Sequence, residues 1–179
     1  VESRGLGDVY KRQVKNMKFR VSSLPVVKII SSSFVHLFFV GFIFVMYALY
    51  GRYPSIYNIQ VVYYYLCTVV LLLGVTWIMS ALSVFSRDVL NVISLIVQVG
   101  FWATPLVWDP GTMPRMVQMI VKINPMYYIC VGYRETFSTQ IWFWEHPYLT
   151  AYFWFFALAQ LCVGAYVFHK LRPQFADML

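Results

Sequence analysis

Charged residues are scarce in this 179-residue sequence: only 12% are Asp, Glu, Lys or Arg, whereas 60% are hydrophobic. A soluble domain contains about 25% charged and about 45–50% apolar residues. The shortage of charge excludes an ordinary soluble domain and indicates a bilayer as the solvent. The net charge of +7 could indicate nucleic acid, but the basic residues form no stripe on a polar domain. Many of them lie beside apolar runs, where they set membrane topology, so we expect no nucleic-acid partner.

Carboxylates, histidines and cysteines are too few and too scattered for a catalytic or metal site. The seven acids lie outside the middle of the apolar runs, and no GxSxG, HExxH or paired-carboxylate spacing is present. Cys67, Cys130 and Cys162 are widely spaced without a CxxC pair, which indicates neither a disulfide framework nor a metal site. His36 lies alone in an apolar run and is more typical of a packing residue than of a ligand. We expect no enzyme activity, catalytic residue or metal in this chain.

A phosphate-binding GxxxxGK[ST] loop is also missing. The chain is therefore not expected to bind and hydrolyse ATP, and we expect no cofactor in it. The polar opening, residues 1–13, begins with Val1 and differs from everything after it. It reads either as a basic cytoplasmic tail or as a translated adapter at the end of an assembled sequence. We favour the second interpretation, a non-native or disordered leader, and leave Val1–Arg12 out of functional reasoning. We also expect the sequence to be a fragment of a longer chain.

Four apolar runs are long enough to cross a bilayer as helices, which requires about 20 residues. Together they form a predicted transmembrane domain over residues 30–168. The predicted spans are residues 30–50, 59–85, 89–107 and 148–168.

The distribution of Lys and Arg predicts the orientation of these spans. If the four spans alternate in direction, the basic segment 14–29, Arg87 and the tail 169–179 fall on one side. The positive-inside rule makes that side the cytoplasm, with a cytoplasmic C-terminus. The loops that hold Arg52 and residues 109–147 then face outward, and Arg115, Lys122 and Arg134 go against the bias.

The region 109–140 contains two short apolar pieces separated by Asn124–Pro125. Neither piece can cross a hydrocarbon core of ~30 Å alone. One possibility is a single kinked crossing, which would place the C-terminus outside; the other is a pair of half-helices that enter and return. The re-entrant hairpin is favoured, because it keeps Lys170 and Arg172 of the tail on the cytoplasmic side. The prolines and glycine of the preceding FWATPLVWDPGTMP stretch would end the third span and turn the chain. The predicted fold class is an all-α integral membrane protein with about four transmembrane helices and a re-entrant outer half-helix hairpin.

Two further features allow a structural and a functional interpretation. At the corner Ser86–Asp88, Asp88 could simply cap the following helix at the positive end of its dipole, or the corner could contact a partner. The Trp and Tyr residues near the outer ends of the spans are typical of interfacial belts. Some of them could instead line a path for a sugar, because flat aromatic faces pack against carbohydrate C–H surfaces.

Several motifs in order resemble one protein family. They are a basic amphipathic segment before a span, FSRDVLNVISLIVQVGFWATPLVW, INPMYYICVGYRETF and a closing FHKLRPQFADML. From Val14 to the C-terminus the sequence resembles the membrane subunit of type-2 ATP-binding-cassette (ABC) exporters. Within that family it is most similar to the branch that exports polysaccharide, O-antigen, capsule or teichoic acid. Such permeases have about six spans, so the resemblance implies that the first two spans and an N-terminal interface helix are absent from this sequence.

The resemblance implies a homodimeric permease in the bacterial cytoplasmic (inner or plasma) membrane, paired with two ATPase subunits that bind ATP. The cargo would be a lipid-linked glycan. Residues placed on the inner side would transmit the force of ATP binding: Lys15, Lys18, Phe19, Arg20, Arg87 and Asp88. Short outer helices would roof the channel exit, with these residues on the transport path: Trp102, Thr104, Pro105, Trp108, Asn124, Pro125, Tyr127, Tyr128 and Arg134.

Two other functions remain open at this point. A type-2 exporter of a drug, haem or lipid would share the fold. A membrane enzyme acting on lipid-linked sugars would need acids or histidines converging on the spans, and the sequence offers few.

Overall fold

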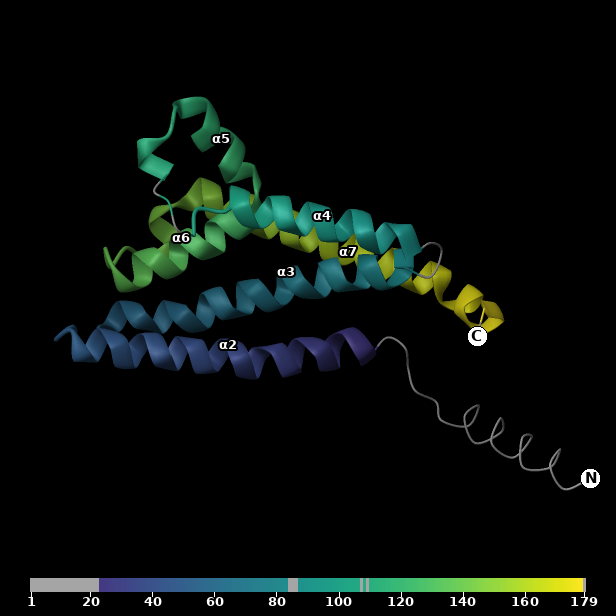
Figure 1. Cartoon of the computed structure of the whole chain (residues 1–179), viewed down its shortest axis with the longest axis horizontal. Coiled ribbons are helices and arrows are strands. Elements are labelled where there is room, and N and C mark those ends of the chain that lie inside the picture. The colour runs from purple at the N-terminus through teal and green to yellow at the C-terminus, as the bar shows by residue number, and fades with distance from the viewer. Residues whose placement is uncertain (1–22, 84–86, 107, 109, 179) are drawn as a thin grey trace, which may run out of the picture.

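The computed structural model describes residues 23–83, 87–106, 108 and 110–178, and in these residues the chain forms helices and no strand (Figure 1). The predicted all-α class is confirmed. Four of the predicted coupling residues lie outside the described part of the chain, as do the predicted leader and most of the segment 14–29. These four are Lys15, Lys18, Phe19 and Arg20.

Six α-helices and three short 3-10 helices follow one another along the described chain. In order they are α2 (Ser23–Leu49), η1 (Ile56–Ile59), α3 (Gln60–Ser83), α4 (Arg87–Ala103), η2 (Pro110–Thr112), α5 (Arg115–Ile123), α6 (Pro125–Phe137), η3 (Phe143–Glu145) and α7 (Pro147–Met178).

Three of these helices have the length and apolar composition needed to cross a membrane: Val26–Leu49, Ile56–Ser80 and Pro147–Lys170. The predicted span 89–107 is shorter in the structure, because helix α4 has 17 residues and ends at Ala103. At 1.5 Å per residue it is about 25 Å long, slightly less than the ~30 Å hydrocarbon core. The third predicted crossing is therefore a shorter helix than the other three.

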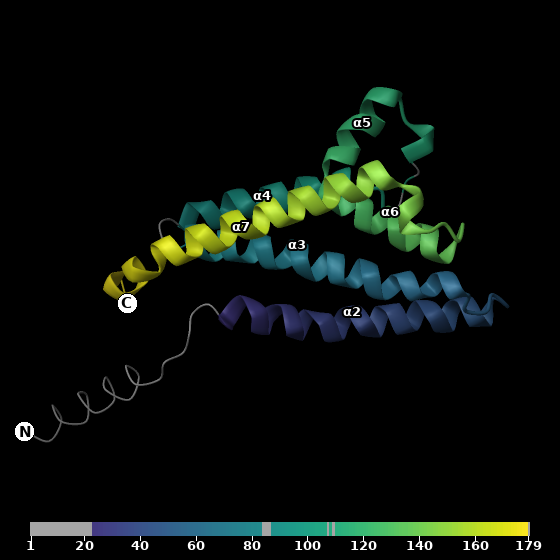
Figure 2. The same ribbon diagram turned by 180° about the vertical axis from the view of Figure 1, so that it is seen from behind.

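The long helices run side by side, with α3 in contact with α2, α4, α6 and α7. The starts of α2 and α4 and the end of α7 lie at one end of the bundle, here called the basal end (Figures 1 and 2). The turn between α2 and α3 and the end of α6 lie at the opposite end, here called the hairpin end. The described parts of the segments that the positive-inside rule predicted to share one side, namely the start of α2, Arg87 and the end of α7, thus lie together at the basal end. Which end faces the cytoplasm stays a prediction.

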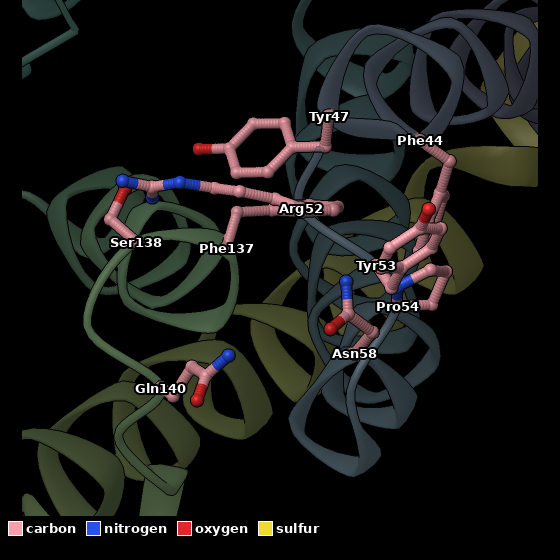
Figure 3. Close-up of a pocket in the computed structure, with 9 residues that line it drawn as sticks. All are labelled: Phe44, Tyr47, Arg52, Tyr53, Pro54, Asn58, Phe137, Ser138 and Gln140. Carbon is pink, nitrogen blue, oxygen red and sulfur yellow. The ribbon is translucent and has the colours of Figure 1, made fainter. Parts of the chain in front are cut away.

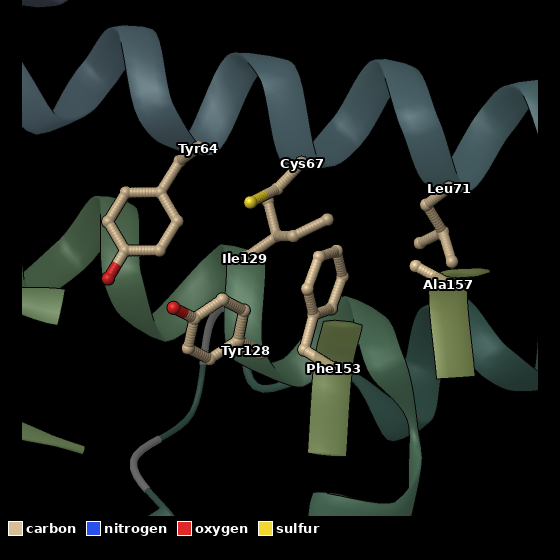
Figure 4. Close-up of a cluster of buried hydrophobic side chains, with 7 residues drawn as sticks. All are labelled: Tyr64, Cys67, Leu71, Tyr128, Ile129, Phe153 and Ala157. Carbon is tan, nitrogen blue, oxygen red and sulfur yellow. The ribbon is translucent and has the colours of Figure 1, made fainter. Parts of the chain in front are cut away.

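The core lies where α3, α6 and α7 meet (Figure 4). Helix α3 contributes Tyr64, Cys67 and Leu71, whose spacing of three and four residues places them on one face. Tyr128 and Ile129 of α6 and Phe153 and Ala157 of α7 complete the cluster. Phe153 stacks on Tyr128 with ring centroids 4.9 Å apart. Burial of these side chains holds the short helix α6 between two long ones.

Nearer the basal end, glycine allows α3 and α7 to approach closely. A Cβ added to Gly164 of α7 would lie 2.9 Å from the carbonyl oxygen of Gly74 on α3, closer than real Cβ atoms come. Small residues at such contacts are typical of helix pairs in membranes, where close backbone packing replaces the hydrophobic effect.

The outward faces of α2 and α4 are strongly apolar. Phe34, Phe38 and Val45 of α2 and Leu95 and Ile96 of α4 all leave more than half of their surface exposed. A soluble monomer rarely exposes contiguous apolar surface of this kind. Together with the three helices of spanning length, these faces identify a multi-pass membrane protein.

Candidate functional site

Helix α4 ends within the bundle at Thr104–Pro105. Pro105 has no N–H to continue the helical hydrogen bonds, and it disfavours helical geometry at the preceding residue. The Thr104 hydroxyl donates to the carbonyl of Gly100 at 2.7 Å, and the side chains of Thr104 and Pro105 are both buried. The break predicted from the sequence is therefore a packed feature of the molecule.

Helices α5 and α6 form a two-legged hairpin whose vertex is Asn124. The Asn124 backbone is extended, with φ −70° and ψ 118°, and its side-chain oxygen accepts a hydrogen bond from the Met126 N–H at 3.0 Å. Asn124 is thus the N-cap of α6, and Pro125 occupies the first helical position, where a missing N–H costs nothing. The two legs have 9 and 13 residues, too few for either to cross a bilayer alone.

The vertex of the hairpin is attached directly to the broken end of α4. The Asn124 side-chain amide donates to the Thr104 hydroxyl at 2.9 Å and to the Gly100 carbonyl at 3.3 Å. Further along α6, the Arg134 guanidinium donates to the carbonyls of Pro105 and Leu106, at 2.5 and 3.2 Å. Five residues predicted for the outer exit are therefore brought together: Thr104, Pro105, Asn124, Pro125 and Arg134.

An open cavity of about 710 Å³ lies between the hairpin and the segment after α4. Predicted exit residues Trp108, Tyr127 and Arg134 line it, together with Gln118, Lys122 and Glu135. The walls therefore combine two aromatic rings with an amide, two cations and a carboxylate. Such a surface can pack on apolar faces of a ligand and hydrogen-bond to hydroxyl or anionic groups.

The remaining two predicted exit residues lie elsewhere. Trp102 is 73% exposed on α4, where it lines a shallow groove with Phe101 and Gln98. Tyr128 is only 5% exposed, lies in the core and does not line the cavity. Tyr127, itself 7% exposed, lines the cavity instead. These neighbours in the sequence face different surroundings, because successive helical residues point about 100° apart.

A chain of hydrogen bonds in the core was not predicted from the sequence. The Trp154 indole donates to the Tyr63 hydroxyl at 2.9 Å, and the hydroxyls of Tyr63 and Tyr128 are 3.0 Å apart. The Tyr128 hydroxyl is 3.0 Å from that of Thr150, which donates to the Phe143 carbonyl. Since the Thr150 proton is used there, Tyr128 donates to Thr150 and Tyr63 donates to Tyr128. The hydroxyl protons of Tyr63, Tyr128 and Thr150 therefore each have an acceptor.

Gln60 is a second residue that sequence reasoning missed. It is 1% exposed, donates from its amide to the Ile141 carbonyl at 2.9 Å and accepts from the Phe143 N–H at 2.7 Å. The start of α3 is thereby fixed to the segment before α7. Its position at the edge of an apolar run was the available signal, since a buried amide needs partners.

Two histidines contact side chains of α6. His36 of α2 is 2.9 Å from the Tyr133 hydroxyl of α6 and stacks on Tyr65, in agreement with a packing role. His146 is 3.1 Å from the Glu135 carboxylate and links the start of α7 to α6. Burial raises the pKa of Tyr133 and Tyr128 on α6, so both hydroxyls stay protonated and can donate.

Two of the predicted coupling residues fall in the described chain, at the basal start of α4. Arg87 is the first residue of that helix, and Asp88 lies in its first turn, at the positive end of the helix dipole. This position agrees with the interpretation of Asp88 as a cap of the helix. Contact of this corner with a partner stays a prediction.

In a comparison with known proteins, the family model of the ABC-2 type transporter matches residues 8–138. Two curated relatives are both O-antigen export system permease proteins RfbA of Klebsiella pneumoniae. Each is 25% identical, over 169 and 172 residues, and each alignment covers 93% of this chain. The chain spans 63% of the length of these relatives.

Proposed function

Because the chain belongs to the ABC-2 type transporter family, we propose that the complete protein is the permease subunit of an ABC exporter for a lipid-linked polysaccharide. The cargo would be of the O-antigen, capsule or teichoic acid type. A homodimer of permeases would work with two separate ATPase subunits that bind and hydrolyse ATP. The bacterial cytoplasmic membrane would hold the complex, with the basal end and the C-terminus in the cytoplasm.

The observation that carries this proposal is the cavity between the hairpin and the end of α4. Trp108 offers an aromatic face to sugar rings, and Tyr127 lines the wall with 7% of its surface exposed. Lys122, Arg134 and Glu135 offer charged hydrogen-bonding groups to hydroxyls or anionic substituents. The two Klebsiella relatives are named for O-antigen export, which supports a polysaccharide over a small cargo.

The geometry also supports a route from the basal end to the cavity. Helix α4 begins at Arg87 and Asp88 and ends at the hydrogen bonds that attach it to Asn124 and Arg134. A helix is stiff along its axis, so a displacement of its first turn by an ATPase would move its far end and the hairpin with it. Arg87 and Asp88, with the basic segment before α2, would receive that force.

The exposed face of α4 supports association of two permeases. Val97 and Trp102 leave most of their surface uncovered, beside Gln98. Polar side chains within a bilayer favour protein contacts, since lipid offers no hydrogen bonds. A second copy on this face would place the two broken helices and their cavities around one path.

The test uses the complete permease, expressed with its ATPase and the genes that make the glycan. Trp108→Ala and Tyr127→Ala should lower the amount of glycan at the cell surface while the permease–ATPase complex still assembles. Tyr148→Ala, at the start of α7 and 90% exposed, controls for the loss of a tyrosine outside the cavity. Because Tyr127 is 7% exposed, the folded amount of each variant is measured alongside export. Normal glycan export by both cavity variants would contradict the proposal. Loss of export of a small molecule, with glycan export intact, would favour the small-cargo exporter.

The proposed transmission of force from the ATPase through the start of α4 is tested separately. Arg87→Ala and Asp88→Ala should reduce both export and the stimulation of ATP hydrolysis by the permease. Unchanged ATPase stimulation together with unchanged export would remove these two residues from the coupling route.

A further inference from the structure

A second cavity of about 430 Å³ lies at the hairpin end, between the end of α2, the turn after it and the end of α6 (Figure 3). Phe44 and Tyr53 line it together with Asn58 and Gln140. Arg52, which follows the left-handed Gly51, sends its side chain along Tyr47 and Phe137 in the direction of Ser138 (Figure 3). This cavity is polar and cationic and has aromatic walls.

A third cavity of about 500 Å³ continues from it along α2. The two cavities share three lining residues, Tyr47, Phe137 and Ser138. The further walls of the third cavity are mostly apolar, including Phe39 and Ile43 of α2. Because Phe39 is exposed on the apolar outer face of that helix, the cavity lies next to the lipid that surrounds the protein.

The charge of the two cavities has one sign. Arg52 lines the first and Arg134 lines the other, and among the described residues no carboxylate lines either of them. Arg134 donates to the carbonyls of Pro105 and Leu106, which are neutral acceptors. A cationic compartment thus adjoins an apolar one.

We propose that these two cavities form a binding site for an anionic lipid, with its apolar chain along α2 and its phosphate at Arg52. A guanidinium binds phosphate through a fork of donors that matches two phosphate oxygens. The neighbouring tyrosines are typical of the level of lipid headgroups. The site also gives a physical reason for arginine at the hairpin end, where the positive-inside rule disfavours it under the proposed orientation.

Two sources share this chemistry, a phospholipid of the bilayer and a polyprenyl phosphate of the kind that carries glycans. The site itself does not depend on which cargo the permease exports. Binding can be measured on the complete permease in detergent by native mass spectrometry. The probes are phosphatidylglycerol, phosphatidylcholine with the same chains, and a polyprenyl phosphate.

We expect phosphatidylglycerol or polyprenyl phosphate to bind more tightly than phosphatidylcholine, and Arg52→Gln to weaken that binding roughly tenfold. Ile43→Trp should also weaken it, by filling the apolar cavity. The controls are Arg115→Gln, an exposed arginine on α5, and Val45→Trp, at a position on α2 that is 57% exposed; neither residue lines the two cavities. The tighter of the two anionic lipids identifies the source.

Equal binding of anionic and zwitterionic lipid would overturn the proposal. So would Arg52→Gln or Ile43→Trp variants that bind no more weakly than their controls. Because the measurement is of binding, its outcome is independent of whether Trp108 and Tyr127 variants export glycan, and the two proposals can fail separately.

Discussion

The side chain of Asn124 holds two helices at once: its oxygen caps α6, and its nitrogen donates to the Thr104 hydroxyl at the broken end of α4, 2.9 Å away. A single amide therefore fixes both the start of the second hairpin leg and the place where that leg meets the bundle. An aspartate carboxylate at this position could cap α6 but not donate to Thr104, and an alanine methyl group could do neither.

Substitution of Asn124 should separate the two roles. Asn124→Ala removes both and should destabilise the permease by about 1–3 kcal/mol, as expected for a lost N-cap and a lost hydrogen bond. Asn124→Asp keeps the acceptor for the Met126 N–H but loses the donor to Thr104, so we expect a smaller loss. Thermal unfolding of the complete permease in detergent measures the stability of both variants. An Asn124→Ala protein as stable as the wild type would contradict the assigned contacts.

Gly132 should not tolerate even one additional carbon. A Cβ at this position would overlap the ring of Tyr64, which is itself buried and has little room to move. Overpacking of this kind costs about 1–3 kcal/mol, so Gly132→Ala should lower the unfolding temperature. Gly41→Ala is the matched control, because no atom lies within 4 Å of a Cβ added there. That substitution should be neutral or slightly stabilising, since alanine favours helix. Equal effects of the two substitutions would contradict the close packing of α6 on α3.

Tyr128→Phe should break the hydrogen-bond chain in its middle. The Tyr63 hydroxyl would lose its acceptor and the Thr150 hydroxyl its donor, and an unpaired buried polar group costs about 1–3 kcal/mol. The double variant Tyr63→Phe/Tyr128→Phe should lose less free energy of unfolding than the sum of the two single losses, because it no longer contains the Tyr63 hydroxyl that Tyr128→Phe leaves unpaired. Chemical unfolding of all three variants completes the cycle. Strictly additive losses would show that the two hydroxyls do not interact.

Arg134→Ala should loosen the segment after α4. The carbonyls of Pro105 and Leu106 would lose a charged donor, which contributes about 1.5–3 kcal/mol. Hydrogen–deuterium exchange should then become faster at the Leu106 amide, which donates to the Thr104 carbonyl at 2.8 Å. Arg115→Ala, at an exposed arginine of α5, should leave that exchange unchanged. Unchanged exchange in the Arg134 variant would mean that this arginine does not hold the segment.

Much of the helical architecture follows from local chemistry. Long apolar runs form helices because a bilayer leaves no other partner for the backbone. Pro105 and Pro125 interrupt the helices where the sequence predicts it, since proline lacks an N–H and restricts the residue before it. The break after Ala103 and the vertex at Asn124 were both readable in this way.

The inward faces of the helices could not be read in the same way. In a helix that is apolar all round, the sequence does not show which side is buried. Tyr127 lines the cavity whereas Tyr128 lies in the core, although the two are identical neighbours. Gln60 finds its partners at Ile141 and Phe143, more than 80 positions away, and no local pattern predicts such a pairing.

The helical membrane fold, the limits of the apolar runs and the two proline breaks can be read from the sequence alone, because they depend on backbone chemistry within a few residues. That the two breaks meet depends on how the helices pack. Asn124 and Thr104 lie 20 residues apart and are joined by a hydrogen bond that exists only when α6 packs between α3 and α7. The cavity beside that junction, and the aromatic and charged groups that line it, follow from this packing.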